Sequence, residues 1–453
     1  MALPVLIALL LSGLAPGHAP ALADEAAEKA ANEAAARANA IESLTPEQAR
    51  RLAAEFPGAD VEITIMGSSK ATFFQALPLS GLKSLDAETA KALAGYGKET
   101  LILNGLTRLD ADTARALAEF KGARLVLNGL KSLDAATAKA LAAYQGEWLG
   151  LCGLTTLDAE TALALAKSSS IRLDLSGLPT LDARIARPLA GFRGQMLMLD
   201  GLRTLDAGTA AALAEYQGPC LELSGLTTLD AATARALVKS KAWDGNLTRL
   251  TTLDAATARS LAEFRGNHLM FQDLTALDAA TAGALSNFRG GLFLQGLKAI
   301  DAATARALVA TFKGHHLIMG SLASLDAATA LALGEYEGLF GIPEEVLAQL
   351  VADLPFDSQT ALVYARLTNG ELAFVTAFTS RDSVEIAKAL ATRKGRLALP
   401  NLKKISPQTL TALIEKRDVE IPLIEKLELI AEPDGSPTED FVIPEWFEAR
   451  QKQ

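Results

Sequence analysis

The sequence is poor in the residues that cross-link small folds or hold metals. Its 453 residues include two cysteines, four histidines and 5% aromatic residues. That content excludes a disulfide-dense scaffold and a zinc module built from repeated Cys and His pairs. No basic stripe is present, and the net charge is -10, so the chain is expected to repel the phosphates of nucleic acids. Half of the residues are hydrophobic, mostly alanine and leucine, which is enough to build a core.

The chain also lacks an apolar run long enough to span a membrane, which takes about 20 residues. A shorter apolar stretch over residues 3–14 precedes a small-x-small triplet, Ala21, Leu22 and Ala23, and this order predicts a signal peptide over residues 1–23. No Lys or Arg precedes the stretch, which departs from the usual signal-peptide pattern. A buried apolar helix is the alternative. We therefore expect a protein that is secreted or located in the periplasm or at the cell surface, without a transmembrane segment.

What the sequence has in abundance is repetition. A Leu-Asp pair recurs every 24 residues, then an Ile-Asp pair and another Leu-Asp pair follow at spacings of 23 and 25, which gives eleven copies. The repeated aspartates are Asp86, Asp110, Asp134, Asp158, Asp182, Asp206, Asp230, Asp254, Asp278, Asp301 and Asp326. One copy, residues 101–122, reads LILNGLTRLDADTARALAEFKG. Periods of this length are typical of solenoids, in which each repeat packs on its neighbours.

Each copy has two halves with different hydrophobic periods. Leu101 and Leu103 alternate with other residues as in a half-buried strand, and Gly105 follows. A row of such glycines indicates either a turn with positive φ or backbones stacked too closely for a Cβ atom. Asp110 stands where a helix N-cap belongs, before Ala and Leu at helical spacing that end near Gly122. A strand, a turn and a helix of about ten residues, repeated, predict a right-handed α/β solenoid with one long parallel sheet.

The unit, written LxLxGLxxLDAxTAxALAxFxG, resembles the repeats of bacterial exported leucine-rich repeat proteins over residues 77–338. The resemblance implies a long parallel sheet on the concave face, short helices on the convex face, and non-catalytic binding of a protein or peptide. One feature departs from the usual unit, which carries Asn or Cys after the strand to form a hydrogen-bonded ladder. Here that place reads Gly-Leu, with Asn only at Asn104 and Asn128.

The pattern degenerates toward both ends, as the caps of a solenoid do. We expect a helical tail with a capping repeat over residues 24–76 and the regular array over residues 77–338. Divergent repeats with a cap should follow over residues 339–431, and an irregular tail over residues 432–453. Within the divergent part, residues 361–378 predict a hairpin that turns at Asn369 and Gly370. Residues 395–414 keep the strand, turn and helix, with Ser406 as the cap.

Catalytic patterns have a simpler explanation in the repeat. Ser80 and Lys83 match the SxxK pattern of some hydrolases, but the same positions read NGLT or SGLT in other copies, so they belong to a repeat turn. The row of aspartates could be interpreted as a cation-binding ladder, but helix capping explains it better. Calcium sites need oxygens from several directions, whereas each aspartate here has a helix N-terminus to cap.

The few metal-binding and thiol residues are expected to lie apart. His268 and His316 are two copies apart, or about 10 Å at the usual strand spacing, too far for shared zinc ligation without further ligands. Cys152 and Cys220 are three copies apart, or about 14 Å, so we expect two free thiols and no disulfide. No cofactor and no metal are expected.

Two positions of each copy vary strongly, namely those immediately before and after the first strand leucine, while the helices repeat Ala, Lys, Arg and Glu. In a solenoid these positions line the concave face, where exposed apolar patches mark contact sites. In the irregular copy over residues 237–250 they fall on Asp244 and Asn246. The alternative is that they are ordinary β-formers on a sheet face. The candidate protein-binding residues, expected to be exposed, are Arg124, Trp148, Arg172, Met196, Met198, Glu222, His268, Met270 and Phe293.

Residues and resemblance together predict an exported, non-catalytic leucine-rich repeat protein of the bacterial cell envelope that binds a protein or peptide through its concave sheet. Trp148 and its arginine neighbours form the best centre, since Trp and Arg dominate interface energetics. A structural envelope protein that self-associates laterally or end to end is the second interpretation. An enzyme acting through residues 339–394 is the least favoured, because that stretch contains no histidine.

Overall fold

The computed structural model describes residues 32–63, 72–437, 444, 446 and 447. The predicted signal peptide over residues 1–23 lies outside the described residues, as do parts of the expected N-terminal and C-terminal tails. The chain divides into two compact units, one up to Leu250 and one from Thr251 onward. Among the described residues, no helix has both the length and the apolar character needed to cross a bilayer.

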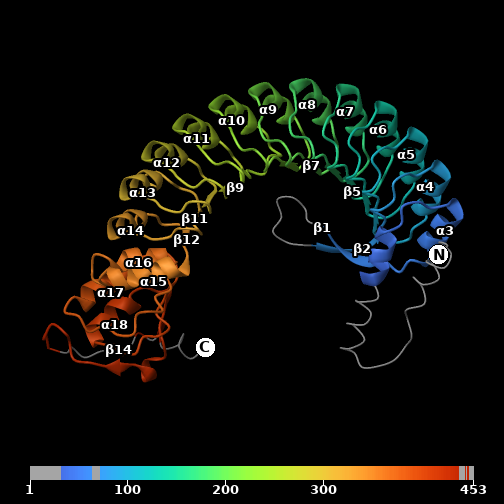
Figure 1. Ribbon diagram of the computed structural model, residues 1–453. Coiled ribbons are helices and arrows are strands. Elements are labelled where there is room, and N and C mark those ends of the chain that lie inside the picture. The colour runs from blue at the N-terminus through green and yellow to red at the C-terminus, as the bar shows by residue number, and fades with distance from the viewer. Residues whose placement is uncertain (1–31, 64–71, 438–443, 445, 448–453) are drawn as a thin grey trace, which may run out of the picture. The chain divides into compact units, whose positions relative to one another are not determined.

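The first unit alternates helices and strands (Figure 1). Its helices are α3 (Pro46–Glu55), α4 (Ala87–Ala94), α5 (Ala111–Leu117), α6 (Ala135–Leu141), α7 (Ala159–Leu165), α8 (Ala183–Leu189), α9 (Ala207–Leu213) and α10 (Ala231–Leu237). Its strands are β1 (Ala59–Ile63), β2 (Thr72–Pro78), β3 (Thr100–Ile102), β4 (Arg124–Val126), β5 (Trp148–Gly150), β6 (Arg172–Asp174), β7 (Met196–Met198) and β8 (Cys220–Glu222). They form one sheet in chain order, antiparallel between β1 and β2 and parallel from β2 onward.

The second unit continues the pattern and then diverges. Its helices are α11 (Ala255–Leu261), α12 (Ala279–Leu285), α13 (Ala302–Val309), α14 (Ala327–Leu333), α15 (Glu344–Asp353), α16 (Ala361–Leu367), α17 (Ser383–Ala391), α18 (Pro407–Ile414) and the 3-10 helix η1 (Ile424–Lys426). Its strands are β9 (His268–Phe271), β10 (Gly291–Leu294), β11 (His316–Ile318), β12 (Leu339–Gly341), β13 (Leu397–Ala398), β14 (Lys404–Ile405), β15 (Val419–Glu420) and β16 (Glu428–Leu429). Strands β9 to β12 form a parallel sheet, and β13 with β15 and β14 with β16 form two small parallel pairs.

The α/β solenoid predicted from the repeat is confirmed, with helices on the outer side of each curved unit and strands on the inner side (Figure 1). Neighbouring strands pair identical positions of successive copies, so Leu101 lies beside Leu125. These strand leucines are fully buried, and the aromatic residues that close the helices are buried as well. Phe120 and Tyr144 stack with their rings 6.3 Å apart, and the Tyr144 hydroxyl donates to the carbonyl of Gly122 at 2.8 Å. Each copy therefore completes the core of the next.

Aspartate caps all eleven repeat helices, as predicted. In α6 the carboxylate of Asp134 accepts from the backbone N–H of Thr137 at 2.7 Å. That hydrogen bond favours the ionised form and lowers the pKa of Asp134. The Thr137 hydroxyl reaches the carbonyl of Leu109 in the preceding copy at 3.4 Å, so the cap also contacts the neighbouring repeat. The helices are seven or eight residues long, shorter than expected.

Replacing Asp134 by alanine is expected to destabilise the protein by about 1 kcal/mol, the usual cost of losing an N-cap side chain. Asp134→Asn should retain most of the stability, because an amide oxygen accepts the same hydrogen bond. Urea unfolding of the two variants at neutral pH measures the difference. Equal losses for alanine and asparagine would show that the carboxylate acts through its charge alone.

The glycine row after the strands is explained by close stacking. Gly105, Gly129 and Gly153 do not have positive φ. A Cβ atom built on Gly153 lies 2.5 Å from the carbonyl oxygen of Leu130 and even closer to that of Asn128, both in the preceding copy. The sequence offered two explanations for these glycines, a turn with positive φ and closely stacked backbones. The second is correct, because the stacked backbones leave no room for a side chain.

The hairpin predicted over residues 361–378 is wrong. Residues 361–367 form α16, whose buried side chains include Val363 and Tyr364. Asn369 and Gly370 do adopt positive φ, but they follow the end of this helix and do not join two strands. Ser406 takes the N-cap position of α18, as predicted, yet its hydroxyl pairs with the Thr409 hydroxyl at 2.8 Å and makes no bond to a helix N–H.

Candidate binding face

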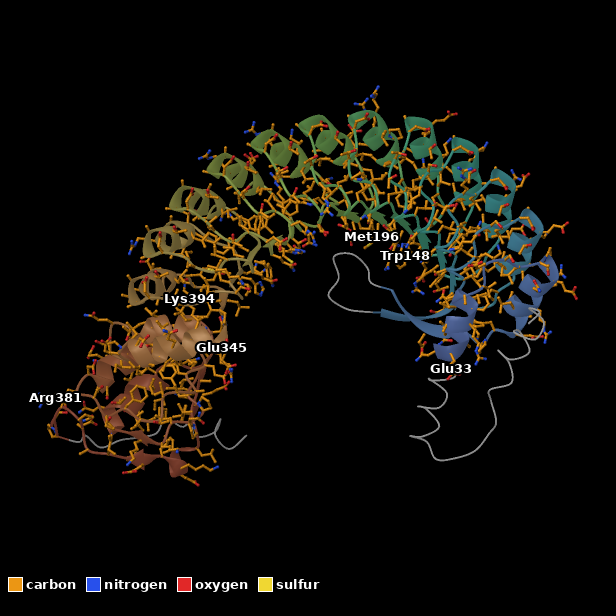
Figure 2. The ribbon with its side chains drawn as sticks, viewed as in Figure 1. Glu33, Trp148, Met196, Glu345, Arg381 and Lys394 are labelled. Carbon is orange, nitrogen blue, oxygen red and sulfur yellow. The ribbon has the colours of Figure 1, made fainter. Side chains whose placement is uncertain are left out.

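The concave face of the first unit is formed by the two strand positions that flank each buried leucine. Because side chains alternate along a strand, these positions point away from the leucine side and its helices. One row runs across adjacent strands from Arg124 through Trp148, Arg172 and Met196 to Cys220. The other row contains Val126, Gly150, Asp174, Met198 and Glu222. Figure 2 shows Trp148 and Met196 on the inner side of the curved ribbon.

The structure therefore brings six of the nine predicted binding residues onto neighbouring strands of the first unit, β4 to β8. The other three, His268, Met270 and Phe293, lie on β9 and β10 of the second unit. Each group is described within its own unit.

Exposure differs from the prediction at two of the nine residues. Trp148 is only 4% exposed and Met198 only 2% exposed, so neither offers a free apolar surface. Ile102 and Val126, also expected to be exposed, are buried and pack with Ala76. The reason is geometric, because parallel strands about 4.8 Å apart press large side chains of one row against each other. Arg172, Met196 and Glu222 remain partly accessible.

The positive charge of Arg124 is neutralised within the protein. Its guanidinium lies 3.3 Å from the Glu99 carboxylate and 3.8 Å from that of Glu147, and its side chain is 14% exposed. Both glutamates come from the loops that precede neighbouring strands. Arg124 thus contributes little net charge to the face.

Carboxylates accumulate at the other end of the face, on β6 to β8 and the copy that follows. We call Asp174, Asp200, Glu222 and Asp244 the acidic centre. Asp174 and Asp200 are 4% and 6% exposed. Desolvation, with the charge of nearby Asp200 adding to it, raises the pKa of Asp174, although the N–H and hydroxyl of Ser176 oppose the shift. Burying several carboxylates together is costly unless protons or cations compensate.

Glu222 is a second member of the acidic centre whose pKa is strongly raised. Burial raises its pKa to about 8, and the carboxylates of Asp200, Asp244 and Asp174 add to the effect. Asp200 lies within hydrogen-bonding reach of Glu222, and one oxygen of each, Oδ2 of Asp200 and Oε2 of Glu222, is buried without a donor. With a pKa of about 8, Glu222 is mostly protonated at neutral pH, and its carboxyl proton is available for a hydrogen bond to a neighbouring oxygen.

Asp200 was missed by the sequence analysis, although its position contained the signal. The Asn104 side chain accepts from the N–H of Asn128 at 3.0 Å, and Asn128 does the same for Cys152 at 3.2 Å, which is the ladder of the usual leucine-rich repeat. Asp200 occupies the equivalent place and accepts from the N–H of Ser224 at 2.8 Å. An asparagine suffices for this structural role, so the charge of Asp200 is a separate feature.

Asp244 lies in the acidic centre because its segment pairs with β8 in a register shifted from that of the regular copies. Trp243 lies opposite Leu221, so Asp244 stands beside Glu222, where Asn246 was expected. The N–H of Leu221 donates to the carbonyl of Ala242 at 2.8 Å, which fixes this alignment. Gly245, with φ of +81°, accommodates the extra residues before the next buried leucine.

The two cysteines are free thiols, both partly buried. Burial raises the pKa of each to about 12, and nearby carboxylates add to this effect, with Asp174 beside Cys152 and Glu222 beside Cys220. Thiols with such a pKa are protonated and unreactive at neutral pH. Across residues 32–63 and 72–437, no group of three or more His, Cys, Asp or Glu residues has the geometry to hold a metal ion.

The sheet of the second unit presents aromatic and imidazole rings. Phe293 packs against His268 at a ring distance of 5.9 Å and against His316 at 6.4 Å. Gly291 lies between the two histidines in the strand register, and a Cβ atom there would come within 3.1 Å of the Phe293 ring. The glycine thus lets the phenylalanine fold over its own strand. His268, Met270 and Phe293 are partly exposed.

Comparisons with known proteins give similarity in shape alone. No protein-family model matches the chain, and no curated protein matches it. The Toll–Spatzle complex of Drosophila aligns over 76% of this chain and 49% of that chain, with 14% identity and a TM-score of 0.40. The complex of TLR13 with ssRNA13 aligns over 78% and 51%, with 16% identity and a TM-score of 0.40.

A third similar structure is the leucine-rich repeat ectodomain of the receptor kinase GASSHO1/SCHENGEN3 from Arabidopsis thaliana, in complex with CASPARIAN STRIP INTEGRITY FACTOR 2. It aligns over 76% of this chain and 58% of that chain, with 12% identity and a TM-score of 0.24. The chain spans about half the length of the Toll and TLR13 chains.

Proposed function

We propose that this chain is an exported, non-catalytic binding protein that contacts a protein or peptide through the concave face of its first unit. One observation carries the proposal: the side chains that differ from copy to copy gather on this face, on β4 to β8, while the helices repeat nearly the same residues. A solenoid needs identical packing residues to stack, so variation on one face is not required by the fold.

The accessible part of the face has the composition of an interface. Arg172 and Met196 are neighbours in one row of the sheet and both are partly exposed. Arginine and methionine are enriched at protein interfaces. Trp148 lies next to Arg172 and is buried, so it supports the face from within and is not proposed as a direct contact.

The proposal is tested by affinity capture from cell-envelope and culture-supernatant extracts with the full chain as bait. We expect the double variant Arg172→Ala, Met196→Asp to lose a protein that the parent retains. The matched control carries Leu163→Asp and Arg187→Ala, two exposed residues of α7 and α8 on the helical side. Circular dichroism verifies that both variants fold.

A partner that is lost equally from both double variants would contradict binding through the concave face. Recovery of the protein itself and nothing else would favour self-association instead. In that case light scattering should show an assembly whose size the Arg172→Ala, Met196→Asp variant does not change.

A further inference from the structure

A small pocket of the second unit is surrounded mainly by positive charge. Its volume is about 30 Å³, and its lining residues are Glu337, Gly338, Arg366, Thr392, Arg393 and Lys394, the last of which is labelled in Figure 2. The hydrogen bond from Lys394 lowers the pKa of Glu337, and the charges of Lys394, Arg366 and Lys313 add to the effect. Four cations therefore lie around one carboxylate, in a chain whose net charge is -10.

The two arginines of the pocket are held in place by backbone carbonyls. The Arg366 guanidinium donates through Nη1 to the carbonyl of Gly334, the C-cap of α14. Arg393 donates through Nε to the carbonyl of Ala365 in α16 at 3.0 Å, and through Nη1 to two carbonyls of the loop that follows it. Cationic donors are favourable at helix C-termini, and these bonds fix both guanidinium groups before any ligand arrives.

Capping leaves part of each guanidinium unused. Within the described part of the chain, Nη2 of Arg366 and Nη2 of Arg393 donate no hydrogen bond, and neither side chain forms an ion pair with a carboxylate. Asp418 attracts Arg393 from a greater distance, but it forms its own ion pair with Lys416 at 2.5 Å. The two arginines thus retain donors and charge for a further group.

The positions of these arginines are electrostatically unfavourable without such a group. Burial lowers the pKa of Arg393; Asp418 opposes this shift, and the nearby charge of Arg366 adds to it. Arginine remains protonated in proteins, so the repulsion is not relieved by the loss of a proton. An anion that contacts both guanidinium groups would compensate for the burial and the repulsion together.

We propose that this pocket binds a phosphate group, held between the guanidinium groups of Arg366 and Arg393 with Lys394 beside it. The planar fork of a guanidinium matches two oxygens of a phosphate, and two forks with a lysine suit a dianion better than a single carboxylate. A space of about 30 Å³ holds about two water molecules, so the phosphate displaces them while anything attached to it stays outside. The ligand is accordingly a free phosphate ion or the phosphate of a monoester.

Glu337 limits the affinity of this site. Its carboxylate lines the pocket and lies 2.8 Å from the ammonium group of Lys394, so an incoming phosphate is repelled by Glu337 and competes with it for the lysine. Removing the charge of Glu337 should therefore strengthen binding. The pocket belongs to the second unit and involves none of the residues proposed to bind a protein on the first, so it is a separate site.

The experiment follows the phosphorus NMR signal of inorganic phosphate, and separately of glycerol phosphate, during titration with the full chain at low ionic strength. We expect binding by the parent and about tenfold weaker binding by Arg366→Gln, the effect of losing one charge-assisted hydrogen bond. Glutamine keeps a donor for the carbonyl of Gly334, and circular dichroism verifies that the variant folds. Tighter binding of glycerol phosphate would identify a monoester as the ligand, and tighter binding of inorganic phosphate would identify the free ion.

A gain in affinity provides the test that misfolding cannot imitate. Glu337→Gln is expected to bind phosphate about threefold to tenfold more tightly, since it removes the repulsion and releases Lys394. The matched control is Glu428→Gln, which also removes an exposed glutamate paired with a lysine, Lys404 at 2.9 Å, but which does not line the pocket. The control should leave the affinity unchanged.

Three results would overturn the proposal. The first is no binding of either phosphate compound, and the second is equal affinity of the parent and Arg366→Gln. The third is an equal gain in Glu337→Gln and Glu428→Gln, which would show attraction to the overall charge of the protein. Displacement of phosphate by an equal concentration of acetate would also contradict it, because the site would then bind any small anion.

Discussion

Replacing Gly153 by alanine is expected to destabilise the first unit by about 3 kcal/mol, at the upper end of the cost of overpacking a well-packed site. A Cβ atom there overlaps the carbonyl oxygens of Asn128 and Leu130, and both belong to the rigid backbone of the preceding copy. A flexible side chain could move aside, but two stacked backbones must separate. In a solenoid that separation weakens the interface between two repeats, on which the stability of the array depends.

Urea unfolding followed by circular dichroism measures the loss, and Gly97→Ala is the control. Gly97 also lacks positive φ, but a Cβ atom there has no heavy atom within 4 Å. Alanine at that position should change stability by less than about 1 kcal/mol and even stabilise the chain slightly, because it reduces the freedom of the unfolded state. Similar losses for both variants would show that the glycine row is selected for something other than backbone stacking.

The solenoid and its helix caps were predictable because both depend on local sequence. A carboxylate three residues before Thr137 caps a helix whatever lies further along the chain, and the 24-residue spacing makes Asp134 and its counterparts do so in every copy. The stacking of Phe120 on Tyr144 follows from the same spacing. Because the local pattern repeats at a fixed spacing, it also predicts which residues of neighbouring copies contact each other.

The exposure of side chains on the concave face was not predictable in the same way. Alternation shows on which side of the strand Trp148 and Met198 lie, but not how tightly the neighbouring side chains cover them. That depends on the curvature of the sheet and on the size of the residues in adjacent copies. The sequence therefore identifies the face, while the accessible subset of Arg172, Met196 and Glu222 emerges only from packing.

Register slips and divergent repeats also limited what could be predicted from the sequence. Counting 24 residues from Cys220 gives Asp244 the pre-strand position, whereas the bulky Trp243 occupies the leucine position instead. Burial of the indole outweighs the regular spacing, and Gly245 accommodates the difference. In residues 361–378 an Asn-Gly pair suggested a hairpin, but the same two residues end a helix equally well.

Replacing Glu222 by glutamine is expected to stabilise the protein at alkaline pH and to remove part of its pH dependence. Burial and the neighbouring carboxylates, Asp200 first among them, raise the pKa of Glu222 to about 8, whereas an unfolded glutamate ionises near 4.5. Between these values the unfolded state holds fewer protons than the folded state. The free energy of unfolding of the parent therefore falls as the pH rises from about 4.5 to about 8.

Glutamine does not ionise, and its amide nitrogen can donate to a buried carboxylate oxygen that has no donor, such as Oδ2 of Asp200. Each pH unit between the two pKa values is worth about 1.4 kcal/mol, and the partial exposure of Glu222 reduces the sum. We expect Glu222→Gln to be about 2–3 kcal/mol more stable than the parent at pH 9, and nearly equal to it at pH 4. Urea unfolding across this pH range measures both.

Asp200→Asn tests the same pair from the other side. The amide oxygen should still accept the ladder hydrogen bond from the N–H of Ser224, just as the neutral side chain of Asn128 accepts one from the N–H of Cys152. The amide nitrogen can donate to Glu222. The pKa of Glu222 should then fall, because the nearest carboxylate is gone, and the decline in stability should move to lower pH and become smaller. Glu215→Gln on the helical side should reproduce the parent profile. If all four proteins show one profile, the carboxylate of Asp200 does not raise the pKa of Glu222.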